Sequence, residues 1–159
     1  MAIDLTAIAT AAEYKARNNR SSSDSDALLD VYLLGVTRVV ERRIGVAAGM
    51  LKPQTNLTFV FDGSGKRRLY LRDERLGQYL LRSITADSLG VDNSQSGAYT
   101  DYTLDLADSF VQGVPSNADT FNEPFTAIDL LPISGASLGI WPPFRASIQI
   151  TGNWGWATT

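Results

Sequence analysis

Apolar side chains recur at helical spacing in the first third of the chain. The recurring positions are Leu28, Leu29, Tyr32, Val36, Val39, Val40 and Ile44, which follow the i, i+3, i+4, i+7 rule. This spacing predicts a long helix whose apolar face lies in the core, so that a charge at Leu29 or Val36 would unfold the domain. Asp24 or Asp26 would cap the start of this helix. Gly45 would end it.

A shorter helix is expected before it. Thr10 and Glu13 have the spacing of a capping box, in which each side chain accepts a hydrogen bond from the free backbone N–H of the other residue. This helix would run to about residues 18–19, and the polar residues 20–23 would form the loop to the long helix.

Beyond Pro53 the pattern changes to that of strands, because β-branched and aromatic residues cluster between stretches of Gly, Ser, Asn and Asp. The expected strands are residues 57–61, 69–71, 79–85, 102–106, 125–131 and 146–151. The first two would form a hairpin around residues 62–65. Residues 90–100 and 112–123 would be long exposed loops. Helices followed by strands predict an α+β fold, with an N-terminal helical pair (10–45) and a β-rich part (55–156) of antiparallel hairpins.

Composition narrows the possible chemistry. The chain of 159 residues has no cysteine and no histidine, which excludes Cys nucleophiles, disulfides, zinc sites built on Cys or His, and histidine-based catalysis. The net charge of −3 argues against a broad nucleic-acid-binding face, but not against a wall that DNA slides past. There is no apolar run of the ~18 residues that a membrane span needs. The N-terminus has no basic start followed by an apolar block, so we expect no secretory signal.

Two acidic pairs have the spacing of paired catalytic carboxylates: Asp101 with Asp105, and Asp24 with Asp26. Neither pair has a neighbouring cation or apolar pocket that would separate the two pKa values. Roles in turns and helix caps are therefore favoured over catalysis.

The basic cluster consists of Lys66, Arg67, Arg68, Arg72 and Arg75. Lys66, Arg68 and Arg72 would share one face of the expected hairpin, because their separations are even. Two interpretations stay open. The cluster is either a solvated strand edge that charge protects from aggregation, or a contact with an acidic partner or with phosphates.

The three tryptophans are the other candidate contacts. Trp141 precedes two prolines that fix an extended bend before the last strand, where it would be a lid on the core or a contact. Trp154 and Trp156 are two residues apart, so an extended strand would place them on the same face. Such a pair either closes the core or lies against an adjacent subunit.

The order of these motifs resembles the head-tail connector (adaptor) proteins of tailed bacteriophages. The matching pieces are TAAEYKAR and SDSDALLDVYLLGVTRVVERRIG for the helices, FVFDGSGKRRLYL for the first hairpin, DYTLDL and PFTAIDLLP for the middle strands, and WPPFRASIQITGNWGW for the close. They cover residues 5–156 in the same order. In that family a small helical bundle carries a β-rich portion, and copies close into a ring beneath the portal vertex of the capsid.

The resemblance implies a structural virion protein, a single adaptor domain over residues 1–159, without catalytic, cofactor-binding or metal-binding residues. Its implied partners are the portal protein, a tail-completion (stopper) or tail-tube protein, and its own copies in a closed ring, dodecameric by resemblance. Genome DNA would pass through the lumen without sequence-specific binding, and no membrane would be involved. The protein would be made in the host cytoplasm and act at the head–tail interface. The candidate protein–protein contacts are Lys66, Arg67, Arg68, Arg72, Trp141, Trp154 and Trp156.

Two further expectations follow. Relatives continue past the Gly-Trp segment into another helix, so here that helix is either dispensed with or replaced by a short extended tail. A basic lumen would hold passing phosphates, so the basic cluster is expected to face outward or toward a partner protein.

The alternative function is a small soluble sugar- or peptide-binding module that uses the tryptophans and the long loops. A carboxylate hydrolase is least favoured.

Overall fold

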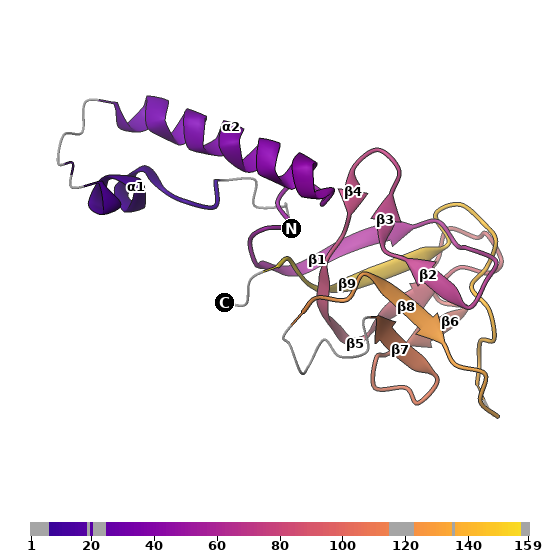
Figure 1. The fold of residues 1–159 in the computed structure, drawn as a ribbon. Helices are drawn as coiled ribbons and strands as arrows, with labels where there is room; N and C mark the ends of the chain where they lie inside the picture. The colour runs from indigo at the N-terminus through magenta and orange to yellow at the C-terminus, as the bar shows by residue number, and fades with distance from the viewer. Residues whose placement is uncertain (1–6, 19, 21–24, 115–122, 135, 157–159) are drawn as a thin grey trace.

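The helices come first along the chain and the strands follow, so the predicted α+β order is confirmed. The computed structural model describes residues 7–18, 20, 25–114, 123–134 and 136–156. Figure 1 shows a helical arm, made of α1 (Ala11–Arg17) and α2 (Asp26–Ile44), that projects from one end of a β-rich body. The arm and the body bury very different side chains.

The ends of the helices follow the sequence closely, with one exception. The capping box of α1 is present, since Thr10 Oγ1 accepts from Glu13 N at 3.2 Å and Glu13 Oε2 accepts from Thr10 N at 2.7 Å. α2 ends at Gly45, whose φ of 79° is in the left-handed region that glycine adopts freely. The N-cap of α2 is Ser25 and makes no capping hydrogen bond with its side chain.

The predicted capping of α2 by an aspartate is therefore wrong for Asp26 and lies outside the described residues for Asp24. Asp26 is the first residue of the helix, and its carboxylate forms an ion pair with Lys15 of α1. The carboxylate thus connects the two helices of the arm.

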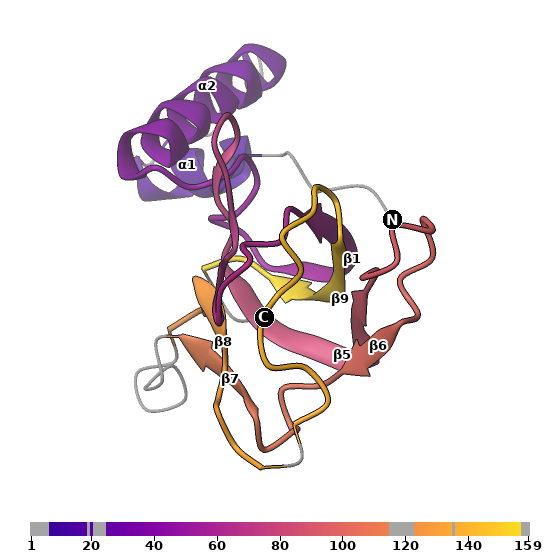
Figure 2. The ribbon, with the colours of Figure 1, turned by 90° about the vertical axis from the view of Figure 1, so that its right-hand side faces the viewer.

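The body holds two sheets and a small hairpin, and every pairing between its named strands is antiparallel. The strands are β1 (Gln54–Phe61), β2 (Arg68–Tyr70), β3 (Arg72–Asp73), β4 (Gly77–Gln78), β5 (Leu81–Val91), β6 (Tyr102–Leu104), β7 (Val111–Val114), β8 (Ala127–Leu130) and β9 (Ile148–Trp154). One sheet has the order β1-β9-β5-β6 and the other β2-β8-β7, while β3 pairs with β4. The β3–β4 hairpin reaches toward the arm (Figure 2), where Ala47 N donates to Gln78 O at 2.9 Å.

The predicted hairpin around residues 62–65 is wrong. β1 pairs with β9, and β2 pairs with β8 in the other sheet. The segment between β1 and β2 runs beside the segment that precedes β9. Gly63 N donates to Phe144 O at 2.8 Å, and Trp141 N donates to Lys66 O at 2.9 Å. These bonds carry the chain from one sheet to the other, so it does not turn back on itself.

Both predicted long loops contain strand residues. β5 continues into the predicted loop 90–100, and β7 occupies the start of the predicted loop 112–123, of which residues 115–122 are outside the described part. Gly113 makes β7 resemble a loop in the sequence. A Cβ at this position would lie 2.4 Å from the Phe125 ring, so the glycine leaves room for that ring.

The core lies in the body. Its largest fully buried side chains are Trp141, Trp154, Met50, Leu69, Leu71, Leu81, Leu89, Leu104, Ile128, Leu130, Ile148 and Ile150. Trp154 packs edge-to-face on Phe59, with ring centroids 4.9 Å apart. Ala11 is the one apolar side chain of α1 and α2 that is fully buried. The arm therefore contributes little to the core of its own chain.

Candidate functional site

The long helix α2 exposes most of its apolar side chains. Leu28, Val31, Tyr32, Leu34, Val36, Val39, Val40 and Ile44 are all exposed, from 36% for Leu34 to 68% for Val39. The prediction of a core-facing helix is therefore wrong, since Leu29 alone of the seven predicted positions is even partly buried. The physical reason is that α2 projects beyond the body, and among the described residues α1 and the segment just before it lie along this helix, as Figure 1 shows.

Shallow apolar grooves lie along the arm. One, of about 290 Å³, is lined by Tyr14, Lys15, Arg20, Ser25, Leu28, Leu29 and Tyr32. Another, of about 420 Å³, is lined by Ala7, Ala9, Thr10, Asp30, Val31 and Leu34. Exposed apolar ridges next to grooves are the surface relief that another helix packs against. The shape and the chemistry of the arm therefore suit contact with protein.

α2 buries polar side chains where it joins the body. Thr37 and Glu41 are 1% and 2% exposed. Thr37 Oγ1 donates to Leu33 O at 2.8 Å and accepts from Ile8 N at 3.2 Å. Nothing in the spacing of apolar residues pointed to these two positions, because a helical pattern identifies buried positions by their hydrophobicity.

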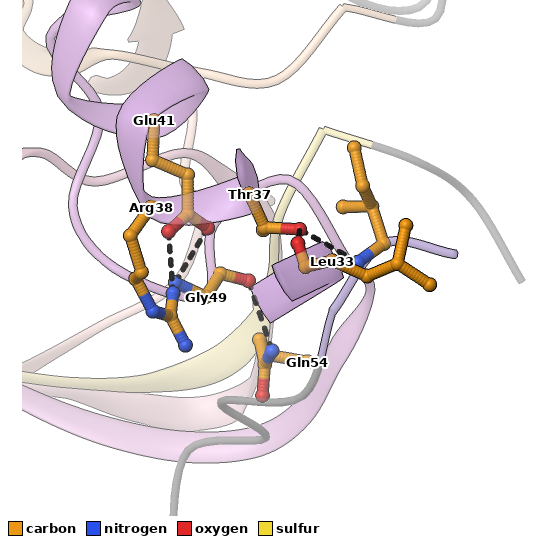
Figure 3. Close-up of polar contacts among 7 residues, drawn as sticks. Leu33, Thr37, Arg38, Glu41, Gly49 and Gln54 are labelled. Atoms are coloured by element: carbon orange, nitrogen blue, oxygen red, sulfur yellow. Dashed lines mark hydrogen bonds and ion pairs between the residues drawn. The ribbon is translucent and has the colours of Figure 1, made fainter. Parts of the chain in front are cut away.

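Figure 3 shows how Glu41 is satisfied. Its Oε1 accepts from Gly49 N at 2.7 Å, and its Oε2 pairs with the guanidinium of Arg38. On the other side of the same residue, Gly49 O accepts from the buried Gln54 Nε2 at 2.9 Å. Gly49 is thus held by α2 through its N–H and by the first residue of β1 through its carbonyl.

Two of the three tryptophans belong to the core. Trp141 and Trp154 are buried, and their indole N–H groups donate to Arg67 O at 2.9 Å and to Leu57 O at 3.0 Å. These bonds satisfy the polar atom of each ring, as burial of a tryptophan requires. Among the candidate contacts, neither side chain is therefore available to another subunit.

Trp156 is 55% exposed, so the expectation that Trp154 and Trp156 share a face is wrong. Gly155 lies between them with a φ of 109°, which breaks the alternation of an extended strand. A Cβ at Gly155 would lie 1.9 Å from Lys52 O, so the close approach of the two backbones requires glycine. Trp156 remains a candidate contact.

All five residues of the basic cluster are exposed, but they do not share a face. Arg68 lies in β2 and Arg72 in β3, which belong to different sheets. Arg68 forms two hydrogen bonds of 2.7 and 2.6 Å with Asp129, its register partner on β8. The hydrogen bond to Asp129 raises the pKa of the Arg68 guanidinium, so this cation is matched within the chain.

The other end of the cluster lines a groove of mixed charge. The groove, of about 560 Å³, is lined by Val60, Phe61, Asp62, Arg72, Asp73, Glu74, Arg75, Tyr79 and Arg145. Asp73 accepts hydrogen bonds from Arg75 N at 2.7 Å and from Leu76 N at 2.9 Å, and the bond from Leu76 is the main reason why the pKa of Asp73 is lowered. Equal numbers of cationic and anionic side chains make this groove unlike a phosphate-binding face.

Asp101 and Asp105, one of the two acidic pairs that were considered for catalysis, accept hydrogen bonds within loops and turns. Asp101 Oδ2 accepts from Ser94 N at 2.6 Å, and Asp105 Oδ1 accepts from Ala107 N at 3.2 Å. No group of three or more acidic side chains in the described part of the chain could hold a metal ion. Within the same residues, none of the helices combines the length and the hydrophobicity of a membrane span.

Comparison of the chain with protein-family models, with curated proteins and with solved structures finds no match in any of the three. The feature that an isolated small domain leaves unexplained is the arm, because eight apolar side chains of its helix α2 are exposed, and large exposed apolar surfaces usually mark contacts with other molecules.

Proposed function

We propose that this protein is a ring-forming adaptor subunit at the head–tail interface of a tailed bacteriophage, and that the arm of each copy packs against an adjacent copy. The observation that carries the proposal is the exposed apolar surface of α2. A helix of 19 residues is roughly 28 Å long at the α-helical rise. Its exposed leucine, isoleucine, valine and tyrosine side chains run along this length.

The arm supports a contact between copies of the chain. A stable contact buries on the order of 1,000 Å² or more in total, which an apolar arm with α1 alongside can supply. The body offers no second projecting helix among the described residues, so arm and body would meet as unlike surfaces. Contacts between unlike surfaces close into rings when the rotation between subunits permits it.

The charge of the chain also supports a role as the wall of a channel through which DNA passes. The net charge of −3 and the pairing of Arg68 with Asp129 both weaken the attraction of the chain for the phosphates of DNA. The proposal keeps the portal protein and a stopper or tail-tube protein as the neighbours above and below the ring. The basic cluster would face one of them, and the virion would be the place of action.

The alternative, a sugar- or peptide-binding module, loses its main support in the structure. Such a module needs exposed aromatic rings, whereas Trp141 and Trp154 are fully buried and hydrogen-bonded within the core. Trp156 is the one exposed tryptophan of the three, and the exposed tyrosines Tyr14, Tyr32 and Tyr70 are divided between the arm and β2.

The test of the proposal is the state of assembly. Native mass spectrometry and negative-stain electron microscopy of the purified protein, alone and mixed with a portal protein from a tailed phage, should show closed rings of one size. The rings should sit coaxially on the portal. A protein that stays monomeric in both samples at micromolar concentration would overturn the proposal.

A further inference from the structure

We infer that the buried carboxylate of Glu41 fixes the direction of the arm relative to the body, and thereby whether the ring closes. The second half rests on the proposed function, whereas the first half is a property of a single chain. α2 reverses the usual distribution of apolar and charged side chains between core and surface. α2 exposes its apolar side chains, while a charged residue of the same helix is 2% exposed.

A buried carboxylate persists only when its oxygens are paired, and both oxygens of Glu41 are. One accepts from Gly49 N at 2.7 Å, and the other pairs with Arg38 one turn earlier on α2. Arg38 belongs to the same helix and cannot orient it. The bond to Gly49 crosses from the helix to the segment that follows it, so this bond carries orientation.

The backbone between arm and body would otherwise act as a pivot. Gly45 ends α2 with φ 79°, and Gly49 follows with φ 87°, so two left-handed glycines flank a short connection. Backbone bonds hold the connection itself, since Gln78 N donates to Gly45 O at 2.9 Å. They attach the chain at the end of the helix, which is one point, and a helix attached at one point can still swing.

Glu41 supplies the second point. It lies one turn inside the helix, and its partner Gly49 is anchored to β1 by Gln54 Nε2 at 2.9 Å (Figure 3). Gln54 is in turn the register partner of Trp154 on β9, in the centre of the core. Through Gly49 and Gln54, the carboxylate therefore connects α2 to a buried pair of strands in the body.

The direction of the arm matters for assembly because of geometry. In a ring of unlike contacts, the relation between arm and body within one subunit sets the rotation from each copy to the next. A fixed direction gives the same rotation at every contact, and the ring closes at one copy number. A swinging arm gives variable rotations, which produce open chains or mixed copy numbers.

Two near-isosteric variants test the first half. Glu41→Gln retains an oxygen that can accept from Gly49 N, whereas Glu41→Leu keeps the volume and removes the acceptor. Because the chain has no cysteine, spin labels can be attached at Ala27→Cys near the tip of α2 and Thr103→Cys on β6, both exposed positions. The distribution of distances between the two labels, measured by pulsed electron–electron double resonance, should be narrow in the wild type. It should stay narrow in Glu41→Gln and in the exposed control Arg43→Ala.

In Glu41→Leu the distribution of distances should become broad, while the body keeps its cooperative melting transition. A distribution as narrow as that of the wild type would overturn the inference. If Glu41→Leu does not melt cooperatively, Gln54→Leu decides by the same comparison, because it releases Gly49 from β1 and leaves α2 unchanged. In Gln54→Leu too, a narrow distribution of distances would overturn the inference, and a broad distribution would support it.

Electron microscopy of the unlabelled proteins tests the second half. Rings of one size in the wild type and open or mixed assemblies in Glu41→Leu are the expected result. Identical rings in both proteins would show that Glu41 does not govern closure. Absence of rings from the wild type would contradict the proposed function, and the distance measurement would still decide whether Glu41 orients the arm.

Discussion

At the scale of single residues, one glycine separates the roles of two tryptophans that look alike in the sequence. Gly155 reverses the strand alternation, so that Trp154 enters the core and Trp156 remains at the surface. Gly155 N also donates to Leu80 O at 2.7 Å, which holds the reversal in place. The same local pattern thus yields one structural side chain and one candidate contact.

Trp154→Ala should destabilise the isolated protein by about 3–5 kcal/mol, because it leaves a large cavity beside Phe59 and Tyr79. Trp156→Ala should change the free energy of unfolding by less than about 0.5 kcal/mol, as exposed substitutions usually do. Chemical denaturation of both variants at low protein concentration gives the comparison. Equal losses of stability would contradict the assignment of Trp156 to the surface.

We expect Asp92 to make the free energy of unfolding depend on pH. It is buried, and burial opposes ionisation of its carboxylate. Hydrogen bonds from Ser96 N at 2.9 Å and Gly97 N at 2.7 Å outweigh this effect and hold the pKa of Asp92 below its ordinary value. A carboxyl group with a lowered pKa in the folded state contributes its stability above the unfolded pKa and loses it as the pH falls through the folded pKa.

The melting temperature of the wild type should therefore fall on acidification below the ordinary carboxyl range of about 4. Asp92→Asn, which keeps one of the two acceptor oxygens but cannot titrate, should show a flatter dependence. Differential scanning calorimetry between neutral and acidic pH compares the two. Parallel curves would mean that the loop bonds of Asp92 do not control this transition.

At the scale of elements, the sequence predicts the helices better than their surroundings. Local signals set the capping box at Thr10 and the end of α2 at Gly45, and both are confirmed because they depend on neighbouring residues alone. The apolar periodicity of α2 shows that one face must pack against another surface. It does not say whether that surface belongs to the same chain or to another one. That is why the predicted burial fails at Val36 and is only partial at Leu29.

Strand pairing is likewise not determined by neighbouring residues alone. The strands at 57–61 and 69–71 are found near their predicted places, but their partners lie far along the chain in β9 and β8. Hairpin prediction assumes that neighbours in sequence pair, whereas here backbone bonds to the segment before β9 divert the chain. For the candidate site, the exposed cations were predictable from charge, but the buried pair of Thr37 and Glu41 was not.

Val36→Asp gives a test at the level of α2. Val36 is 59% exposed, so the variant should keep its free energy of unfolding within about 0.5 kcal/mol, contrary to the expectation from periodicity. Assembly should be lost, because a charge would enter the apolar contact. Ile140→Asp, on an exposed apolar position of the body, is the matched control and should still assemble.

Denaturation curves and native mass spectrometry of these two variants separate folding from assembly. Unfolding of Val36→Asp at low concentration would show that α2 packs into its own chain after all. Assembly of Val36→Asp equal to that of the control would place the subunit contact elsewhere.

At the scale of the whole molecule, three arginines of the basic cluster lie beside carboxylates. Arg68 is matched by Asp129, and Arg72 and Arg75 share a groove with Asp62, Asp73 and Glu74. The chain as a whole carries −3. This balance is what a surface beside moving DNA requires, since each phosphate contact adds affinity that resists movement.

The purified protein should accordingly not retard duplex DNA on a gel at physiological salt. The expected reason is that no large set of cations can displace the counterions of the DNA. Binding that weakens steeply with salt and disappears in a Lys66→Glu, Arg67→Glu double variant would place these residues in the path of the DNA, against the prediction.

Both ends of the described chain are held near the root of the arm. Ile8 N donates to Thr37 Oγ1 at 3.2 Å, and Trp156 N donates to Met50 O at 2.7 Å, next to Gly49. A purification tag fused to either terminus would be joined to these anchored residues by only the six residues before Ala7 or the three after Trp156, and so could reach the surface that we propose for subunit contact. A tagged protein that remains monomeric could owe that state to the tag, so reconstitution should use protein from which the tag has been removed.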